Sequence, residues 1–209
     1  MNKLVVELAK DYTLDKSSFA AKMSQIDLES AKMIISDLLD MNLTDPNFSS
    51  LAETIPLEIG GYNSHDIKHG YDGFIGESYD IADEYVEQKP QKTSNTDKKL
   101  NGGGSFADYT LVRLSKDKSH GDKLKLMISG FVNGELIYVY KVPHNHSTFI
   151  DHIEGRTTQL ISDGKRVLPS FSYKNYEDCD DIELVFRRPD ISKYVDYMGK
   201  PFYDFVNKL

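Results

Sequence analysis

Three ionisable residues between positions 72 and 89 combine the chemical groups that phosphodiester hydrolysis requires. Asp72 opens an apolar run, and Glu87 and Lys89 follow at the end of the next β-like run. Side chains two positions apart on a strand project from the same face, so we expect Glu87 and Lys89 to point together and Gln88 to point away. Asp72, on a neighbouring strand, is then expected to converge with Glu87 on a divalent ion.

Mg²⁺ is the expected ion because it prefers oxygen ligands, often one or two carboxylates together with water and phosphate oxygens. The expected ligands are the carboxylates of Asp72 and Glu87 and the main-chain carbonyl of Gln88, and Mn²⁺ is expected to substitute for Mg²⁺. Such an ion polarises a phosphate and lowers the pKa of a bound water. Lys89 would orient or deprotonate that water, or stabilise the charge that builds on the phosphate.

An acid two residues before a lysine is a short pattern, and its spacing alone also fits a solvated strand edge. The chain holds four such pairs: Asp66-Lys68, Glu87-Lys89, Asp97-Lys99 and Asp163-Lys165. Asp97 lies in a polar segment and Asp163 in a turn, whereas Glu87 ends a β-like run and has Asp72 upstream. Context therefore favours the Glu87-Lys89 pair as the one that does chemistry.

The stretch GYDGFIGESYDIADEYVEQKP, residues 70–90, resembles the core of the PD-(D/E)XK nuclease superfamily, to which most type II restriction endonucleases belong. In that family an Asp begins one strand of a hairpin and an (Asp/Glu)-x-Lys follows on the next. Asp72, Glu87 and Lys89 match these positions, while Tyr71 stands where the family often has Pro. The resemblance implies a Mg²⁺-dependent endonuclease that hydrolyses double-stranded DNA at specific sequences.

The same resemblance suggests accessory residues around the site. The family often recruits a further acid from a helix before the first strand, for which Glu53 and Glu58 are the candidates. Apart from the resemblance, His69 is a third accessory candidate because it lies three residues before Asp72. For each of these residues taken singly, an ordinary surface position is the competing interpretation.

Four basic residues follow the motif and are expected to contact DNA phosphates. They are Lys92, Lys98, Lys99 and Arg113. The formal net charge of −8 argues against a nucleic-acid partner. Net charge is a sum, however, and affinity for phosphate depends on where the cations lie.

The order of expected elements indicates an α/β fold with a mixed sheet, in agreement with the α/β/α core of restriction endonucleases. We expect one nuclease domain over residues 1–209, with a helical part at 1–56, a mixed-sheet core at 62–188 and a C-terminal helix at 189–209. Expected strands cover 71–75, 79–86, 107–115, 123–131 and 135–143, and a polar loop covers 88–105. Asn133-Gly134 is a strong two-residue hairpin signal.

Other features of the sequence indicate where in the cell the protein acts and which partners it does not need. No apolar run is long enough to span a bilayer, no export signal is recognised at the N-terminus, and the single cysteine fits a reducing compartment. We therefore expect a cytoplasmic protein, of bacterial or phage origin, that needs no membrane. Gly102-Gly103-Gly104 lacks the ending of a P-loop, so no nucleotide cofactor is expected.

Cutting both strands of a duplex with one site per chain usually calls for two copies, so we expect a homodimer, with the C-terminal helix as a candidate interface. Two alternatives remain open at this stage. One is a nicking, repair or recombination nuclease that acts on branched or single-stranded DNA. The other is a non-catalytic binding or assembly protein, which the acidic net charge favours.

Overall fold

A hairpin of two buried strands, β5 and β6, forms the centre of the fold. The computed structural model describes residues 3–45, 49–65 and 70–209. In it β5 spans Leu124–Val132 and β6 spans Glu135–Pro143, and nearly every residue of both strands is buried. The strands pair antiparallel, and the turn residues Asn133 and Gly134 both have positive φ, as a tight hairpin turn requires. The predicted hairpin is confirmed.

Four further strands extend this hairpin into an open, mixed sheet of six strands in the order β1-β2-β3-β5-β6-β8. Their bounds are Asn63–Ser64 (β1), Gly73–Ile75 (β2), Glu84–Thr93 (β3) and Glu183–Arg187 (β8). The β3 strand runs parallel to β5, and the other neighbours are antiparallel. Together with eight α-helices in the described residues, the sheet gives a mixed α+β architecture.

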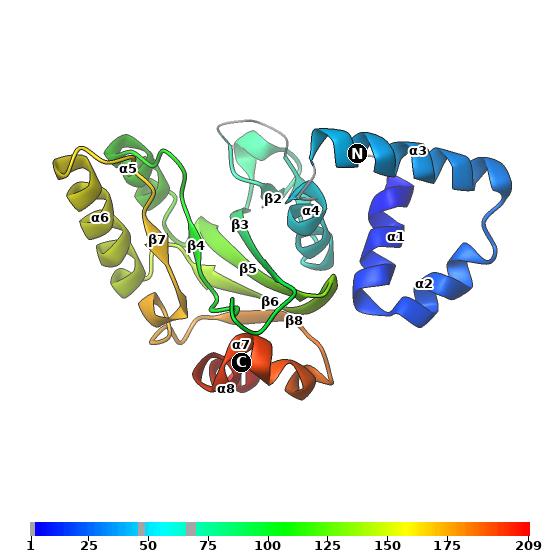
Figure 1. Cartoon of the computed structure of the whole chain (residues 1–209). Helices are drawn as coiled ribbons and strands as arrows, with labels where there is room; N and C mark the ends of the chain where they lie inside the picture. The colour runs from blue at the N-terminus through cyan, green and yellow to red at the C-terminus, as the bar shows by residue number, and fades with distance from the viewer. Residues whose placement is uncertain (1–2, 46–48, 66–69) are drawn as a thin grey trace.

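Helices cover both faces of the sheet (Figure 1). One face packs against α5 (Leu111–Ser119), α6 (Ser147–Ser162), α7 (Val195–Met198) and α8 (Lys200–Lys208). The core on this side joins buried side chains of the hairpin to Phe149, Ile153, Phe202 and Val206. The segment predicted as one C-terminal helix contains two short helices, α7 and α8, which meet at Gly199.

The other face packs against α1 (Lys3–Leu14) and α4 (Ser49–Ile59). Val6 and Ile55 meet Met127 and Val139 of the hairpin in this second core. Two more helices, α2 (Lys16–Met23) and α3 (Leu28–Thr44), complete the N-terminal segment and form an open triangle with α1 beside the sheet (Figure 1). No helix in the described residues has the length and apolar character needed to cross a bilayer.

The strand that carries the Glu87-Lys89 pair differs from its predicted extent. Residues 79–81 form a short 3-10 helix, and β3 begins only at Glu84 and continues to Thr93. The predicted loop at 88–105 is therefore wrong over its first six residues. The polar composition of this stretch is typical of a loop. It forms a strand because β3 pairs with β5 along its length, from Tyr85 to Thr93.

The strand predicted at 107–115 is also wrong, because most of it belongs to α5. Thr110 caps this helix by accepting a hydrogen bond from the main-chain N–H of Arg113. Leu114 is buried while Leu111 and Val112 are exposed, so the helix is amphipathic. Over so few residues this pattern resembles the alternation of a strand. The three expected β-rich runs thus become one helix and one hairpin.

A two-stranded ribbon closes over the site-bearing strand. Its strands are β4 (Gly104–Ser105) and β7 (Ser170–Phe171), which pair antiparallel. At Gly103, next to this ribbon, an added Cβ would lie 2.1 Å from the carbonyl oxygen of Phe171. Only glycine therefore allows the main chain to approach this closely.

We predict that Gly103→Ala lowers the free energy of unfolding by roughly 1–3 kcal/mol, because the ribbon must separate to admit the methyl group. For a chain of this size the melting temperature shifts by about 2–4 °C per kcal/mol. Gly155→Ala is the matched control, since a Cβ there meets nothing within 4 Å. The control should be neutral or stabilising, and equal effects of the two substitutions would contradict the close approach.

Candidate active site

The β2–β3 hairpin brings Asp72 against the Glu87-Gln88-Lys89 segment. Asp72 directly precedes β2, and its Oδ2 accepts a hydrogen bond of 2.6 Å from the main-chain N–H of Gln88. The ladder between the two strands ends where Gly73 pairs with Val86, so Gln88 lies beyond the paired region. Main-chain N–H and C=O groups of one strand residue face the same edge. The carbonyl of Gln88 therefore faces the same open edge as Asp72.

Glu87 and Lys89 project together, as their spacing predicts. The Nζ of Lys89 donates a hydrogen bond of 2.7 Å to Oε1 of Glu87, and these side chains are 16% and 15% exposed. The Lys89 ammonium also lies 4.9 Å from the ring centroid of Phe106. Gln88 points to the opposite face, where its side chain is buried and donates to Ser129.

A buried carboxylate on α5, that of Asp117, contacts Glu87 indirectly, through Arg113. Oε2 of Glu87 lies 3.4 Å from Nη2 of Arg113, whose Nε donates to Oδ1 of Asp117 at 2.8 Å. Asp117 is 2% exposed and also accepts hydrogen bonds from the hydroxyls of Tyr71 and Tyr109, at 2.7 and 2.6 Å. A buried charge that is satisfied by three donors holds its partners firmly. Arg113 is thus fixed in place and orients Glu87.

Burial and the neighbouring charge of Glu87 disfavour the ionised form of Asp72. The pKa of Asp72 is raised to about 7, first by burial and then by the charge of Glu87. The Lys89 ammonium and the N–H of Gln88 act in the opposite direction. Two close carboxylates beside an outward-facing carbonyl make an oxygen-rich donor set, and this set fits Mg²⁺ when water and phosphate supply the remaining ligands.

Of the two candidate accessory acids, only Glu53 lies near the site. Glu53 lines a cleft together with Gln88 and Lys89. Its pKa is raised by burial and by the charges of Asp45 and Glu87, although Lys89 lowers it. Glu58 instead forms an ion pair of 3.2 Å with Lys10.

The third accessory candidate, His69, lies outside the described residues. Among the residues that the structure does describe, no three or more His, Cys, Asp or Glu side chains are grouped to hold a metal ion. The groups that could hold a metal ion here are the carboxylates of Asp72 and Glu87 and the main-chain carbonyl of Gln88, and Glu53 lies further along the cleft.

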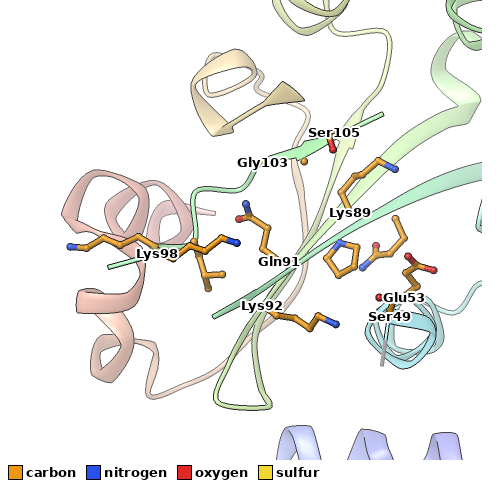
Figure 2. A pocket seen from close by; sticks show the side chains of 13 residues that line it. Ser49, Glu53, Lys89, Gln91, Lys92, Lys98, Gly103 and Ser105 are labelled. Atoms are coloured by element: carbon orange, nitrogen blue, oxygen red, sulfur yellow. The ribbon is translucent and has the colours of Figure 1, made fainter. Parts of the chain in front are cut away.

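The cleft has a volume of about 460 Å³ and carries the expected basic residues. Figure 2 shows Lys89, Gln91 and Lys92 along β3, with Ser49 and Glu53 on the facing helix α4. The cleft is lined by four lysines: Lys89, Lys92, Lys98 and Lys99. Arg113, the remaining basic candidate, does not line it and is paired with Glu87 and Asp117.

Sequence reasoning missed Asp117, although a signal for it exists. Arg113 and Asp117 are four positions apart, a spacing that brings the side chains together on a helix. The strand interpretation of this segment hid that spacing. Thr110, a good N-cap residue, was the feature that could have identified the helix.

No protein-family model matches the chain, and no curated protein sequence matches it.

We predict that Asp72→Asn stabilises the metal-free protein increasingly as pH rises. The folded state holds the Asp72 proton up to about pH 7, whereas an ordinary aspartate loses it near pH 4. The wild type therefore loses stability between about pH 4 and pH 7, and asparagine, which does not titrate, avoids that loss. Melting curves of both proteins across this range, without divalent ions, test the prediction. A melting-temperature difference that stays constant with pH would contradict it.

Proposed function

We propose that this chain is a Mg²⁺-dependent deoxyribonuclease of the PD-(D/E)XK type, with a restriction-endonuclease-like fold. The observation that carries the proposal is the contact between Asp72, at the start of one hairpin strand, and the main chain of Gln88 on the next. Gln88 lies between Glu87 and Lys89, so this one hydrogen bond brings Asp72 next to both of the other motif residues. The open edge beside them leads into a cleft lined by lysines.

The architecture agrees with this proposal. A helix, α4, precedes the β1–β2–β3 meander, and helices cover both faces of the mixed sheet. That arrangement is compatible with the α/β/α core that the resemblance implies. It is shared by other mixed sheets as well, so the proposal depends on the site and not on the fold alone.

In the proposed reaction, Asp72, Glu87 and the carbonyl of Gln88 hold Mg²⁺, and Mn²⁺ substitutes for it. The bound ion supplies Lewis-acid polarisation of the phosphate and a water of lowered pKa. Lys89 points its ammonium group to the same face as Glu87 and stabilises the negative charge on the phosphate or orients the attacking water. Arg113, held by Asp117, keeps Glu87 from turning away.

The substrate that best fits the cleft is double-stranded DNA. Lys92, Lys98 and Lys99 are exposed and line the cleft beyond Lys89, where they would neutralise backbone phosphates. Such contacts orient DNA without reading its sequence. Sequence-specific cleavage by a homodimer is the form of the activity that the resemblance favours, and a nicking, repair or recombination nuclease is the alternative.

We predict that purified protein with Mg²⁺ converts plasmid DNA to discrete fragments. Asp72→Ala, Glu87→Ala and Lys89→Ala should each reduce the cleavage rate by at least roughly a hundredfold, because each removes a group that acts on the phosphate or its ion. The chain offers a matched control in the exposed pair of Asp163 and Lys165, 3.0 Å apart. Asp163→Ala and Lys165→Ala should leave cleavage intact.

Each other result of this assay has a definite meaning. Nicked circles alone, lost in the Glu87→Ala protein, would favour the nicking or repair nuclease. Intact plasmid at high protein concentration would favour the binding or assembly protein. Metal binding is read separately: Mg²⁺ should raise the melting temperature of the wild type, and Asp72→Asn should abolish that rise.

We predict that replacing Lys98 and Lys99 with alanine weakens the binding of every duplex to a similar extent. Each lost phosphate contact should make the slope of log affinity against log salt shallower by about one. Titrations without divalent ions, at several salt concentrations, measure this slope. Lys174→Ala and Lys193→Ala are controls, since these lysines pair with Glu177 and Asp190 away from the cleft. An unchanged slope in the double variant would contradict the assigned DNA path.

A further inference from the structure

A buried histidine, His144, lies behind the candidate active site and has no role in the reaction described so far. It directly follows β6 and is 1% exposed. Its main-chain N–H donates to the carbonyl of Leu124 at 3.0 Å, which fixes the position of the backbone. Within the part of the chain that the structure describes, neither ring nitrogen has a hydrogen-bond partner. A buried polar group without a partner costs free energy, so its presence needs a physical reason.

The carboxylate of Asp117 is the polar group next to this ring. Phe106 and Phe149 contact the ring edge to face, with centroid distances of 6.1 and 5.5 Å. Nε2 of His144 lies 3.8 Å from Oδ2 of Asp117. That separation is longer than a hydrogen bond, and a movement of about 1 Å would close it. The two groups are therefore close enough to interact directly.

Asp117 has room for one more donor. An ionised carboxylate accepts about four hydrogen bonds, two at each oxygen. Oδ1 accepts two, from the hydroxyl of Tyr71 and from Nε of Arg113. Oδ2 accepts one from the described residues, from the hydroxyl of Tyr109. The remaining acceptor position is thus on Oδ2, the oxygen that Nε2 of His144 approaches.

The charge state of His144 fits a donor to this position. Burial lowers the pKa of His144 to about 4, although the charges of Asp117 and Glu87 act in the opposite direction. The ring is therefore neutral at pH 7, with one N–H donor and one bare nitrogen. A bare nitrogen facing Asp117 would set two lone pairs against each other, so we expect the proton on Nε2.

Asp117 is connected to both strands that carry the site carboxylates. Through Arg113 it reaches Glu87 on β3. Through the hydroxyl of Tyr71 it reaches the residue directly before Asp72. A side chain that holds Asp117 in one orientation therefore acts on both carboxylates of the site.

We propose that His144 is a positioning residue of the site, which donates from Nε2 to Asp117 and thereby helps to hold Arg113 and Tyr71 in place. Groups outside the ligand shell orient metal ligands in this way. Hydrogen bonds that support a site are often long in the free protein and tighten in the complex. The inference rests on the proposed function, because the positioning matters only when Asp72 and Glu87 hold an ion.

The tautomer of His144 is the first test, and it needs neither metal nor DNA. Long-range proton–nitrogen correlation spectra show which ring nitrogen carries the proton, and the signals of His144 are identified by their loss in His144→Gln. We expect the proton on Nε2. A proton on Nδ1 would overturn the proposal. Because this measurement uses the wild type, it decides the question even if a substituted protein does not fold.

Two substitutions test the effect on the metal site. His144→Gln keeps an N–H donor near the position of Nε2, whereas His144→Leu removes the donor at similar volume. Titration calorimetry should show a Mg²⁺ dissociation constant that rises roughly three- to tenfold in His144→Leu and stays within about twofold in His144→Gln, less than the ten- to hundredfold typical of groups bonded directly to a metal ligand. His146→Leu is the matched control, since His146 pairs with exposed Asp178 at 2.8 Å.

Melting curves distinguish a donor from a ring that only packs. Loss of a buried polar group without a partner should leave the melting temperature unchanged or raise it, whereas loss of a donor to Asp117 should lower it. We expect His144→Leu to melt below the wild type and below His144→Gln. A higher melting temperature in His144→Leu would overturn the proposal.

The outcomes for Mg²⁺ separate this inference from the proposed function. A wild type that binds no Mg²⁺ would overturn the proposed function. A wild type that binds Mg²⁺ with an affinity that His144→Leu leaves unchanged would overturn the positioning role of His144 alone.

Discussion

The parallel pairing of β3 with the buried strand β5 is the constraint on which the site depends. The ladder runs from Tyr85 to Thr93 and fixes the face to which each β3 side chain points. Gln88 is turned into the core, where it donates to Ser129, and Glu87 and Lys89 are turned together to the other face. A slip of one residue would bury both charged groups and expose Gln88, at a large cost in free energy.

Charge around this strand is arranged in two layers. Asp117 is buried behind the site and satisfied by Arg113, Tyr71 and Tyr109, so it supports other groups and does not face the cleft. Asp72 and Glu87 form the outer layer, where burial and then the charge of Glu87 raise the pKa of Asp72. The lysines extend from there along the cleft. A chain with a negative net charge thus has a cleft lined by lysines, because net charge does not describe how the charged residues are distributed.

Local sequence patterns predicted the centre of the fold well and its polar edges poorly. The Asn133-Gly134 turn and its two apolar strands follow from turn chemistry and burial, which neighbouring residues largely decide. The continuation of β3 through polar residues depends instead on β5, which is more than 30 positions away. The segment at 107–115 was ambiguous for a related reason, because a short mixed run suits a strand or a helix until its packing partner is known.

For the site, the sequence by itself determined the residue types and the side on which Glu87 and Lys89 project, because strand periodicity is a local property of the backbone. It also placed Asp72 one strand away. The tertiary structure alone decided that the Asp72 carboxylate meets the main chain of Gln88, that Glu53 and not Glu58 borders the cleft, and that Arg113 turns inward to Asp117. These choices depend on how α4 and α5 pack against the sheet, and distant contacts set that packing.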